Sequence, residues 1–283
     1  MKYKGELFVI ISAILFGFNP ILANYTFEAG SNPVATTMFN SLIGTVVLFL
    51  INDKQRLKIN HKKMKMILLV APFSAITTIL LFTSYNYIDS GLSTTLHFSY
   101  PLFVCILSYI ILHDHISYKQ VICMIICLLG ICLLYTPGGK INFIGIILAL
   151  ISGVTYATYI TLVNKIKFDE IPSTVYAFYL FLFSTIMMII YASCTHQIVI
   201  MHSITGWSAS IFLGIVQGVL CLILFSKGIV LCGGLKASLL SAFEPVTSII
   251  IGVLFLHEII NFQTFIACFL IILSTILLLK KGE

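Results

Sequence analysis

Residues 234–258, GLKASLLSAFEPVTSIIIGVLFLHE, decide the fold because they combine a long apolar run with an acid and a proline in its middle. One helical crossing of a bilayer takes about 20 apolar residues, so this stretch is long enough to span. A charged group at the centre of such a helix costs at least about 3 kcal/mol. We therefore expect Glu244 to face the interior of a helical bundle, and Pro245 to bend the helix beside it.

The rest of the chain has the same apolar character. Hydrophobic residues make up 59% of the 283 residues and charged residues only 9%, whereas an average soluble domain carries about 25% charged residues. This composition excludes a soluble protein and predicts an all-α integral membrane protein. Ten transmembrane helices are expected, at residues 6–24, 33–51, 66–87, 92–112, 120–135, 143–163, 173–194, 208–231, 236–256 and 262–279.

The distribution of basic residues indicates the orientation of these helices. If the N-terminus is cytoplasmic, fifteen of the sixteen Lys and Arg residues fall in cytoplasmic segments, and Lys140 alone falls outside. This bias follows the positive-inside rule. The closing Lys280 and Lys281 would also fit a retrieval signal in a eukaryote, but the same rule explains them. We expect a multi-pass protein of the plasma membrane, the bacterial cytoplasmic membrane, with both termini cytoplasmic.

Charge and cysteine usage also bear on partners and cofactors. The topology accounts for the net charge of +6, and the basic residues are spread along the inner face, so we expect no nucleic-acid partner. All eight cysteines lie in apolar spans, where reduced packing thiols are expected. Cys123 and Cys127 alone have metal-like spacing, without a nearby His or carboxylate in sequence. We therefore expect neither a metal nor another cofactor.

An internal repeat divides the chain. Residues 91–117 and 234–261 both begin with Gly-Leu, and each has a proline, Pro101 or Pro245, eleven residues before a Leu-His-acid triplet. The first predicted span also matches residues 145–164. These matches predict two five-helix repeats, residues 1–140 and 141–283. Because five is odd, the second repeat would cross the membrane in the opposite sense, which is the inverted arrangement of many secondary transporters.

The repeat also carries a family resemblance. Residues 225–258, FSKGI…GGLKASLLSAFEPV…LFLHE, together with ten spans and paired proline and acid signatures, resemble the EamA-type carriers of the drug/metabolite transporter superfamily. The similarity covers the whole chain and is strongest in the second repeat. In the first repeat, Asp114 stands where that family usually has Glu, and Phe16 where Trp-Gly is common. The resemblance implies a ten-helix secondary carrier, often an exporter of amino acids or other small metabolites.

Glu244 is the first candidate for binding substrate or a proton. It lies ten residues after Gly234, about 15 Å along a helix and hence near the midplane. Lys227, on the preceding helix, is its expected partner. The pair could exchange with a substrate ammonium group or a proton. It could also be a static ion pair that fixes two helices, with Lys227 reaching toward the cytoplasm.

The two repeat-related prolines are the second feature of the expected site. Proline removes the hydrogen bond to the carbonyl four residues earlier, here that of His97 for Pro101 and that of Ser241 for Pro245. Free backbone carbonyls are tolerated in a membrane where they line a cavity. We therefore expect two bent helices facing one cavity, with kinks that serve only packing as the alternative.

Further polar side chains lie at a similar depth. His97 could bind substrate, relay protons or be a neutral core residue, and Tyr100 occupies the repeat position that matches Glu244. Each remaining candidate alone is more often a packing contact between helices, but together they suggest an aromatic, moderately polar cavity. These candidates are Asn19, Tyr159, Tyr156, Tyr85, Gln217, Asn86, Asn40 and Tyr179.

The sequence therefore predicts a secondary active transporter, and not an enzyme, since no nucleophile–base motif is found. An amino acid, an amine or an aromatic metabolite fits the expected cavity, and export by alternating access, driven by exchange or protons, is the favoured mode. The alternative is a non-transporting scaffold or a lipid-translocating accessory subunit. The expected partners are the lipid bilayer and a small-molecule substrate, as a monomer or homodimer. His113, Asp114 and His115 are expected to cap a helix end or to lie at the membrane interface.

Overall fold

The computed structural model describes residues 3–53, 55, 57–88, 90–134, 142–166, 171–256 and 262–279. Within these residues the regular elements are all helices. In chain order they are α1 (Lys4–Phe16), α2 (Asn19–Glu28), α3 (Pro33–Ile51), α4 (His61–Ser84), α5 (Ser90–His97), α6 (Tyr100–Leu107), the π-helix η1 (Ser108–Leu112), α7 (Tyr118–Leu133), α8 (Phe143–Ile166), α9 (Ser173–Cys194), α10 (Ile204–Phe212), the π-helix η2 (Leu213–Cys221), α11 (Leu222–Cys232), α12 (Gly234–Leu240), α13 (Phe243–Leu256) and α14 (Phe262–Leu279).

These helices confirm the predicted fold class. In the described part of the chain, nine helical runs are long and apolar enough to span a bilayer, and α7 is a shorter apolar helix. We number the ten runs as crossings one to ten. The predicted bounds 33–51, 173–194 and 262–279 agree with α3, α9 and α14 to the residue.

Polar caps explain where several helices begin. The side chain of Asn32 accepts a hydrogen bond from the backbone N–H of Ala35, and Asn60 does the same for Lys63. These bonds satisfy backbone donors that a helix start leaves without a partner. At the start of α7, Ser117 and Gln120 form a reciprocal capping box. The short polar breaks of the sequence therefore set the register of the crossings.

Three crossings are broken just ahead of a proline, and in each the next helix begins one or two residues before it. The fourth crossing breaks between α5 and α6, ahead of Pro101, and the ninth breaks between α12 and α13, ahead of Pro245. Both breaks lie where the prolines were expected to bend the helix. The first crossing breaks in the same way between α1 and α2, ahead of Pro20. Pro72, in contrast, lies inside the unbroken helix α4.

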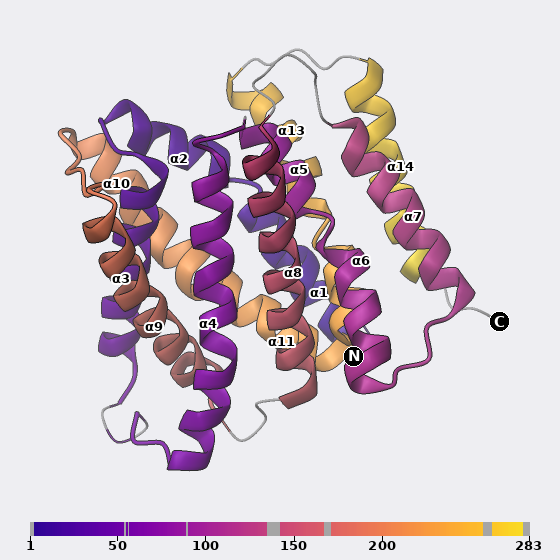
Figure 1. Cartoon of the computed structure of the whole chain (residues 1–283), viewed down its shortest axis with the longest axis horizontal. Helices are drawn as coiled ribbons and strands as arrows, with labels where there is room; N and C mark the ends of the chain where they lie inside the picture. The colour runs from indigo at the N-terminus through magenta and orange to yellow at the C-terminus, as the bar shows by residue number, and fades with distance from the viewer. Residues whose placement is uncertain are drawn as a thin grey trace.

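The crossings pack in pairs that come from distant parts of the chain. α1 packs along α11, α4 along α8, α3 along α9 and α7 along α14. Figure 1 shows α7 and α14 side by side at one edge of the bundle, and α3 and α9 at the opposite edge. The broken crossings lie between these edges, where α6 packs on α8 and α13 on α1. The buried apolar core therefore surrounds the helix breaks.

Candidate functional site

The breaks in the fourth and ninth crossings meet at the centre of the bundle. The Tyr100 hydroxyl, at the start of α6, forms a hydrogen bond with the Ser241 hydroxyl, in the break between α12 and α13. Tyr100 is only 2% exposed. Because these residues belong to the first and the second half of the chain, the bond joins the two halves at their bent helices.

The carbonyl groups freed by the two prolines have different environments. The Ser241 carbonyl accepts a hydrogen bond of 2.9 Å from the Glu244 backbone N–H, three residues on. The His97 carbonyl lies against α8, where a Cβ at Gly153 would be 3.0 Å from its oxygen. A side chain at that position would have to displace the carbonyl or the helix. Glycine therefore allows α8 to approach the break in the fourth crossing.

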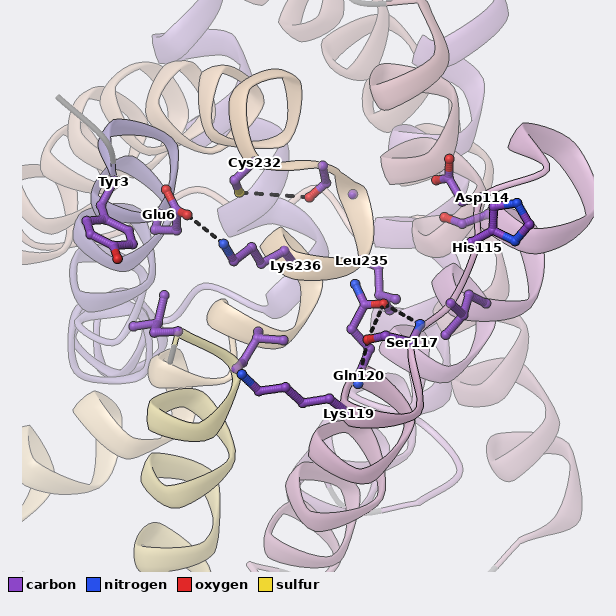
Figure 2. A pocket seen from close by; sticks show the side chains of 16 residues that line it. Tyr3, Glu6, Asp114, His115, Ser117, Lys119, Gln120, Cys232, Leu235 and Lys236 are labelled. Carbon is purple, nitrogen blue, oxygen red and sulfur yellow. Dashed lines mark hydrogen bonds and ion pairs between the residues drawn. The ribbon is translucent and has the colours of Figure 1, made fainter. Parts of the chain in front are cut away.

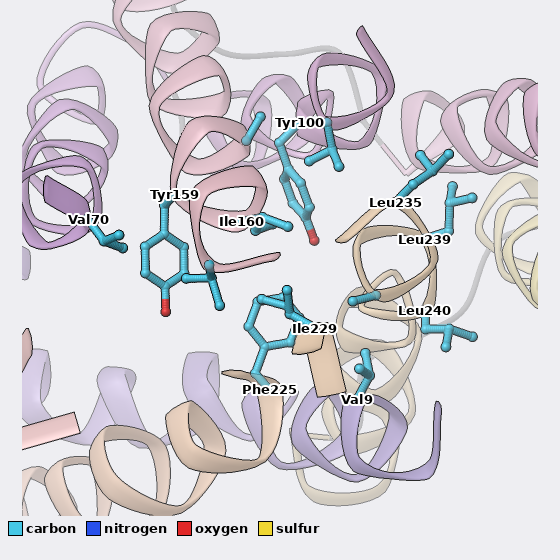
Figure 3. Close-up of a cluster of buried hydrophobic side chains, with 14 of the residues drawn as sticks. Val9, Val70, Tyr100, Tyr159, Ile160, Phe225, Ile229, Leu235, Leu239 and Leu240 are labelled. Atoms are coloured by element: carbon cyan, nitrogen blue, oxygen red, sulfur yellow. The ribbon is translucent and has the colours of Figure 1, made fainter. Parts of the chain in front are cut away.

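An aromatic cluster fills the space beside these breaks. Its members are His97, Tyr100, Tyr156, Tyr159, Tyr176 and Phe225. The Tyr156 ring is at the centre, with its centroid 4.8 Å from that of Tyr100 and 5.4 Å from that of His97. It stacks on Tyr159 at 5.8 Å and on Phe225 at 6.3 Å. Figure 3 shows Tyr100, Tyr159 and Phe225 among apolar side chains that include Ile160 and Leu239.

His97 has a defined hydrogen-bonding partner in this cluster. Its Nδ1 atom lies 2.9 Å from the Ser152 hydroxyl, and that hydroxyl donates its proton to the Ala149 carbonyl at 2.6 Å. Nδ1 must therefore carry the proton and donate to Ser152, which leaves Nε2 as an acceptor in the neutral ring. The structure thus gives His97 a hydrogen bond that joins the two halves of the chain.

Glu244 lies in the first turn of α13, next to the aromatic cluster. Its carboxyl group interacts electrostatically with the hydroxyls of Tyr85, Tyr100 and Tyr156 and with the Cys221 thiol. All four groups belong to crossings other than the ninth, and Tyr85 and Tyr100 belong to the first half of the chain. Glu244 therefore faces the bundle interior, as its cost in lipid requires.

The predicted ion pair between Glu244 and Lys227 is wrong. Lys227 is exposed, on the stripe of the eighth crossing that also carries exposed Leu220 and Leu231. These three residues are seven and four positions apart, so they share one helix face. The neighbouring Gly228 marks the packed face, because a Cβ there would be 2.3 Å from the Val9 side chain. The prediction used depth along the helix, which does not specify the face.

The remaining candidates are dispersed around the cluster. Asn19 is half-buried at the first-crossing break, and the Tyr85 hydroxyl lies 3.5 Å from that of Thr94. Gln217 lies in η2. Two others make structural contacts: the Tyr179 hydroxyl donates to the Leu57 carbonyl at 2.6 Å, and the Asn40 side chain is hydrogen-bonded to Ser210 at 2.9 Å. Asn86 is exposed.

Several residues of this region were not anticipated from the sequence. The Ser152 and Ser241 side chains, Phe225 and Tyr176 all touch the aromatic cluster, and the Tyr176 hydroxyl donates to that of Tyr159 at 3.4 Å. Serine, phenylalanine and tyrosine are frequent in apolar helices, so composition gives them no distinguishing signal. The proline positions were the available signal for Ser241, since its carbonyl was expected to be free.

The comparisons with known proteins agree with this architecture. The EamA-like transporter family matches residues 3–136 and 143–280. The uncharacterized transporter YwfM of Bacillus subtilis (strain 168) is 24% identical over 96% of this chain and 93% of its own length. An uncharacterized transporter of Clostridium kluyveri is 22% identical over 97% of this chain and 92% of its own length.

A solved crystal structure shares the fold. It superposes with a TM-score of 0.82 at 15% identity and covers 99% of this chain and 98% of the other. The family match extends over almost the whole sequence, and these relatives carry transporter names, which points to a transporter rather than an enzyme. This multi-pass membrane protein belongs to the EamA-like transporter family.

Proposed function

We propose that this protein is a secondary active transporter that exports a small metabolite bearing an ammonium group, such as an amino acid or an amine, across the bacterial cytoplasmic membrane. It works by alternating access between two inverted five-helix halves, residues 1–140 and 141–283. Family membership supports transport as such. The packing of the two halves and the chemistry around Glu244 support the mechanism and the substrate class.

Close glycine contacts recur at matching places in the two halves. A Cβ at Gly5 would be 2.8 Å from the Leu231 side chain, and one at Gly145 would be 2.8 Å from Tyr87. Gly5 and Gly145 are 140 positions apart, and Tyr87 and Leu231 are 144 apart, which are the two spacings of the sequence repeat. The contact of the first crossing with the eighth is thus repeated by the sixth with the third.

Two pairs of crossings, α3 with α9 and α7 with α14, join equivalent helices of the two halves, which also supports a two-fold relationship between the halves. Thr45 in α3 and Thr185 in α9 are 140 positions apart, and their hydroxyls are hydrogen-bonded at 2.9 Å. This is the contact expected of equivalent residues that meet at a two-fold axis. Between α7 and α14, Ser274 donates to the Cys123 carbonyl at 2.7 Å. The repeat-equivalent contact is also present: a Cβ at Gly130 would be 2.9 Å from the Ala267 carbonyl. Gly130 is 144 positions before Ser274, and Ala267 is 144 positions after Cys123.

The observation that carries the proposal is the carboxyl group of Glu244 among tyrosines from both halves. A carboxylate beside aromatic rings binds an ammonium group through ion pairing and cation–π attraction. The bent helices place backbone polar groups at the same depth, as in carriers whose sites are built from discontinuous helices. Rocking of the halves would expose such a site to either side in turn. A proton on Glu244 would occupy the site when substrate has left.

Flux measurements with purified protein in liposomes test this proposal. Labelled amino acids and amines are loaded, a pH gradient is imposed, and Glu244→Gln is compared with the matched control Glu28→Gln. Glu28 is exposed at the end of α2, far along the first crossing from its break. We expect Glu244→Gln to lose most of the flux and its dependence on the gradient, and Glu28→Gln to keep both.

Two results would contradict the proposal. Wild-type flux with unchanged pH dependence in a normally folded Glu244→Gln protein would remove the role of this acid. No flux of any solute by folded wild-type protein would favour the alternative, a scaffold or a lipid-translocating accessory subunit. A fluorescent-lipid scrambling assay in the same liposomes would then distinguish the scaffold from the lipid-translocating subunit.

A further inference from the structure

A pocket separate from the aromatic cluster opens where α1 and α7 begin and where η1 and α14 end. Its volume is about 590 Å³, and Figure 2 shows side chains from several crossings converging on it. In the proposed orientation this end is cytoplasmic. The lining residues used below are Tyr3, Glu6, Ser108, Asp114, Lys119 and Lys236.

An ion pair forms part of the pocket wall. The Lys236 ammonium donates to the Glu6 carboxylate at 2.6 Å, which joins the first turn of α12 to the first turns of α1. The exposed fraction is 10% for the Glu6 side chain and 28% for that of Lys236. The Glu6 side chain is mostly covered and that of Lys236 is half-buried, so the two charges stabilise each other, and a ligand of matching charge could take the place of either. Figure 2 shows Lys236 reaching across the pocket to Glu6.

A buried hydroxyl lacks a partner in the same pocket. Ser108, at the start of η1, is 1% exposed, and within the described residues its oxygen makes no hydrogen bond. An unpaired buried polar group costs about 1–3 kcal/mol. The fourth crossing ends at this point in a π-helix, a form that is rare in proteins and often lies at functional sites. The Ser108 oxygen is closed off from the pocket as the chain stands, so a polar ligand would reach it only after a shift of η1.

The charges on the pocket wall suit a zwitterion. Glu6 and Asp114 are acidic, Lys119 and Lys236 are basic, and Figure 2 shows the two lysines entering from different elements. A wall with both signs favours a ligand that carries both signs over a simple anion or cation. Tyr3 and the leucines of α12 and α14 add apolar surface that would contact a side chain.

We infer that this pocket is a second binding site, which loads a zwitterionic amino acid on the side of the chain termini. The ligand carboxylate replaces Glu6 on Lys236, and its ammonium group is received by Glu6. Ligand exchange breaks the tie between α12 and α1 and frees the ninth crossing to move at its break. Lys236 precedes Glu244 by eight residues, and the break between α12 and α13 lies between them. The inference rests on the proposed function and specifies its substrate class.

Binding to the full-length protein in detergent tests the inference. Thermal-shift titrations with the twenty amino acids identify a ligand, and its Kd is then compared with those of its methyl ester and its N-acetyl derivative. The test variants are Lys236→Met and the double variant Glu6→Gln/Lys236→Met, which leaves no unpaired buried charge. Lys165→Met, at the exposed end of α8, is the matched control.

We expect both test variants to raise the Kd of the amino acid by about tenfold to a hundredfold, which corresponds to the loss of one charge-assisted hydrogen bond. Lys165→Met should keep the wild-type Kd, and both derivatives should bind wild type more weakly than the parent amino acid. A Glu244→Gln protein that still binds but no longer transports would support a separate loading site.

Three outcomes would overturn the inference. One is a wild-type Kd in the folded double variant, and another is equal binding of the parent and its methyl ester. The third is the absence of a stabilising amino acid while wild-type liposomes transport an amine. In each case flux that depends on Glu244 would leave the proposed carrier mechanism standing, so the two failures are distinguishable.

Discussion

Tyr100 and Ser241 join the two bent crossings of this protein through a buried hydrogen bond between their hydroxyls. Ser241 also donates to the Ser238 carbonyl at 2.8 Å, so Tyr100 is the donor to Ser241. The bond therefore couples the break in the fourth crossing to the break in the ninth. Any motion that bends one crossing must either break this bond or carry the other crossing along.

A double-mutant cycle measures that coupling. We expect Tyr100→Phe and Ser241→Ala each to lower the free energy of unfolding by about 0.5–1 kcal/mol, with a coupling energy near 0.6 kcal/mol, the average for interhelical hydrogen bonds in membranes. Thermal or SDS-induced unfolding of the purified variants provides the values. A coupling energy of zero would show that the two hydroxyls do not interact in the folded protein.

Gly17 sets the contact between the first-crossing break and α13. A Cβ at this position would be 2.6 Å from the Thr247 Cβ and 3.0 Å from the Ser248 backbone nitrogen. We expect Gly17→Ala to destabilise the protein by about 1–3 kcal/mol, because the helices must separate. The unfolding midpoint of the purified variant reports the loss.

Gly218→Ala is the control for that substitution. Its Cβ would be 3.1 Å from the edge of the half-buried Phe181 ring, a side chain that can shift. We expect a change below about 0.5 kcal/mol, since alanine also favours the helix. Equal destabilisation by both substitutions would mean that close helix approach is not specific to the first-crossing break.

The threonine pair between α3 and α9 should respond asymmetrically to substitution. Thr45 donates to the Ser41 carbonyl at 2.8 Å, so Thr185 is the donor in the Thr45–Thr185 bond. Thr45→Val leaves the buried Thr185 hydroxyl without this acceptor and should cost about 1–2 kcal/mol. Thr185→Val leaves Thr45 its bond to Ser41 and should cost about half as much. Half-buried Thr158→Val in α8, whose hydroxyl donates to the Val154 carbonyl of its own helix, is the comparison. Equal unfolding costs for the two test variants would contradict the donor assignment.

Cys194 offers a test of the predicted orientation. It is exposed at the end of α9, which the positive-inside distribution places outside the cytoplasm. In intact cells we expect a membrane-impermeant maleimide to label a variant that retains Cys194 as its single cysteine. A cysteine at Tyr118, exposed at the start of α7, should be labelled only after permeabilisation. The reverse pattern would invert the proposed topology.

The number and limits of the crossings were predictable from the sequence. Length and apolar character are properties of a segment by itself, because a bilayer requires each span to satisfy its own backbone. The breaks at Pro101 and Pro245 were predictable for the same local reason. Yet Pro72 leaves α4 unbroken, so a proline shows where a helix can break, and packing decides whether it does.

The partners of each polar side chain were decided only in the tertiary structure. Lys227 and Glu244 have opposite charges and were expected within about one helical turn of each other in depth, but Lys227 is exposed, whereas Lys236 pairs with Glu6 of the first crossing. The sequence alone gives the position of a residue along its helix, and the hydropathy of a segment follows from composition alone. Which face of a helix turns inward depends on the neighbouring helices. These spans are apolar on all faces, so hydrophobic periodicity cannot distinguish the face toward lipid from the face toward the core.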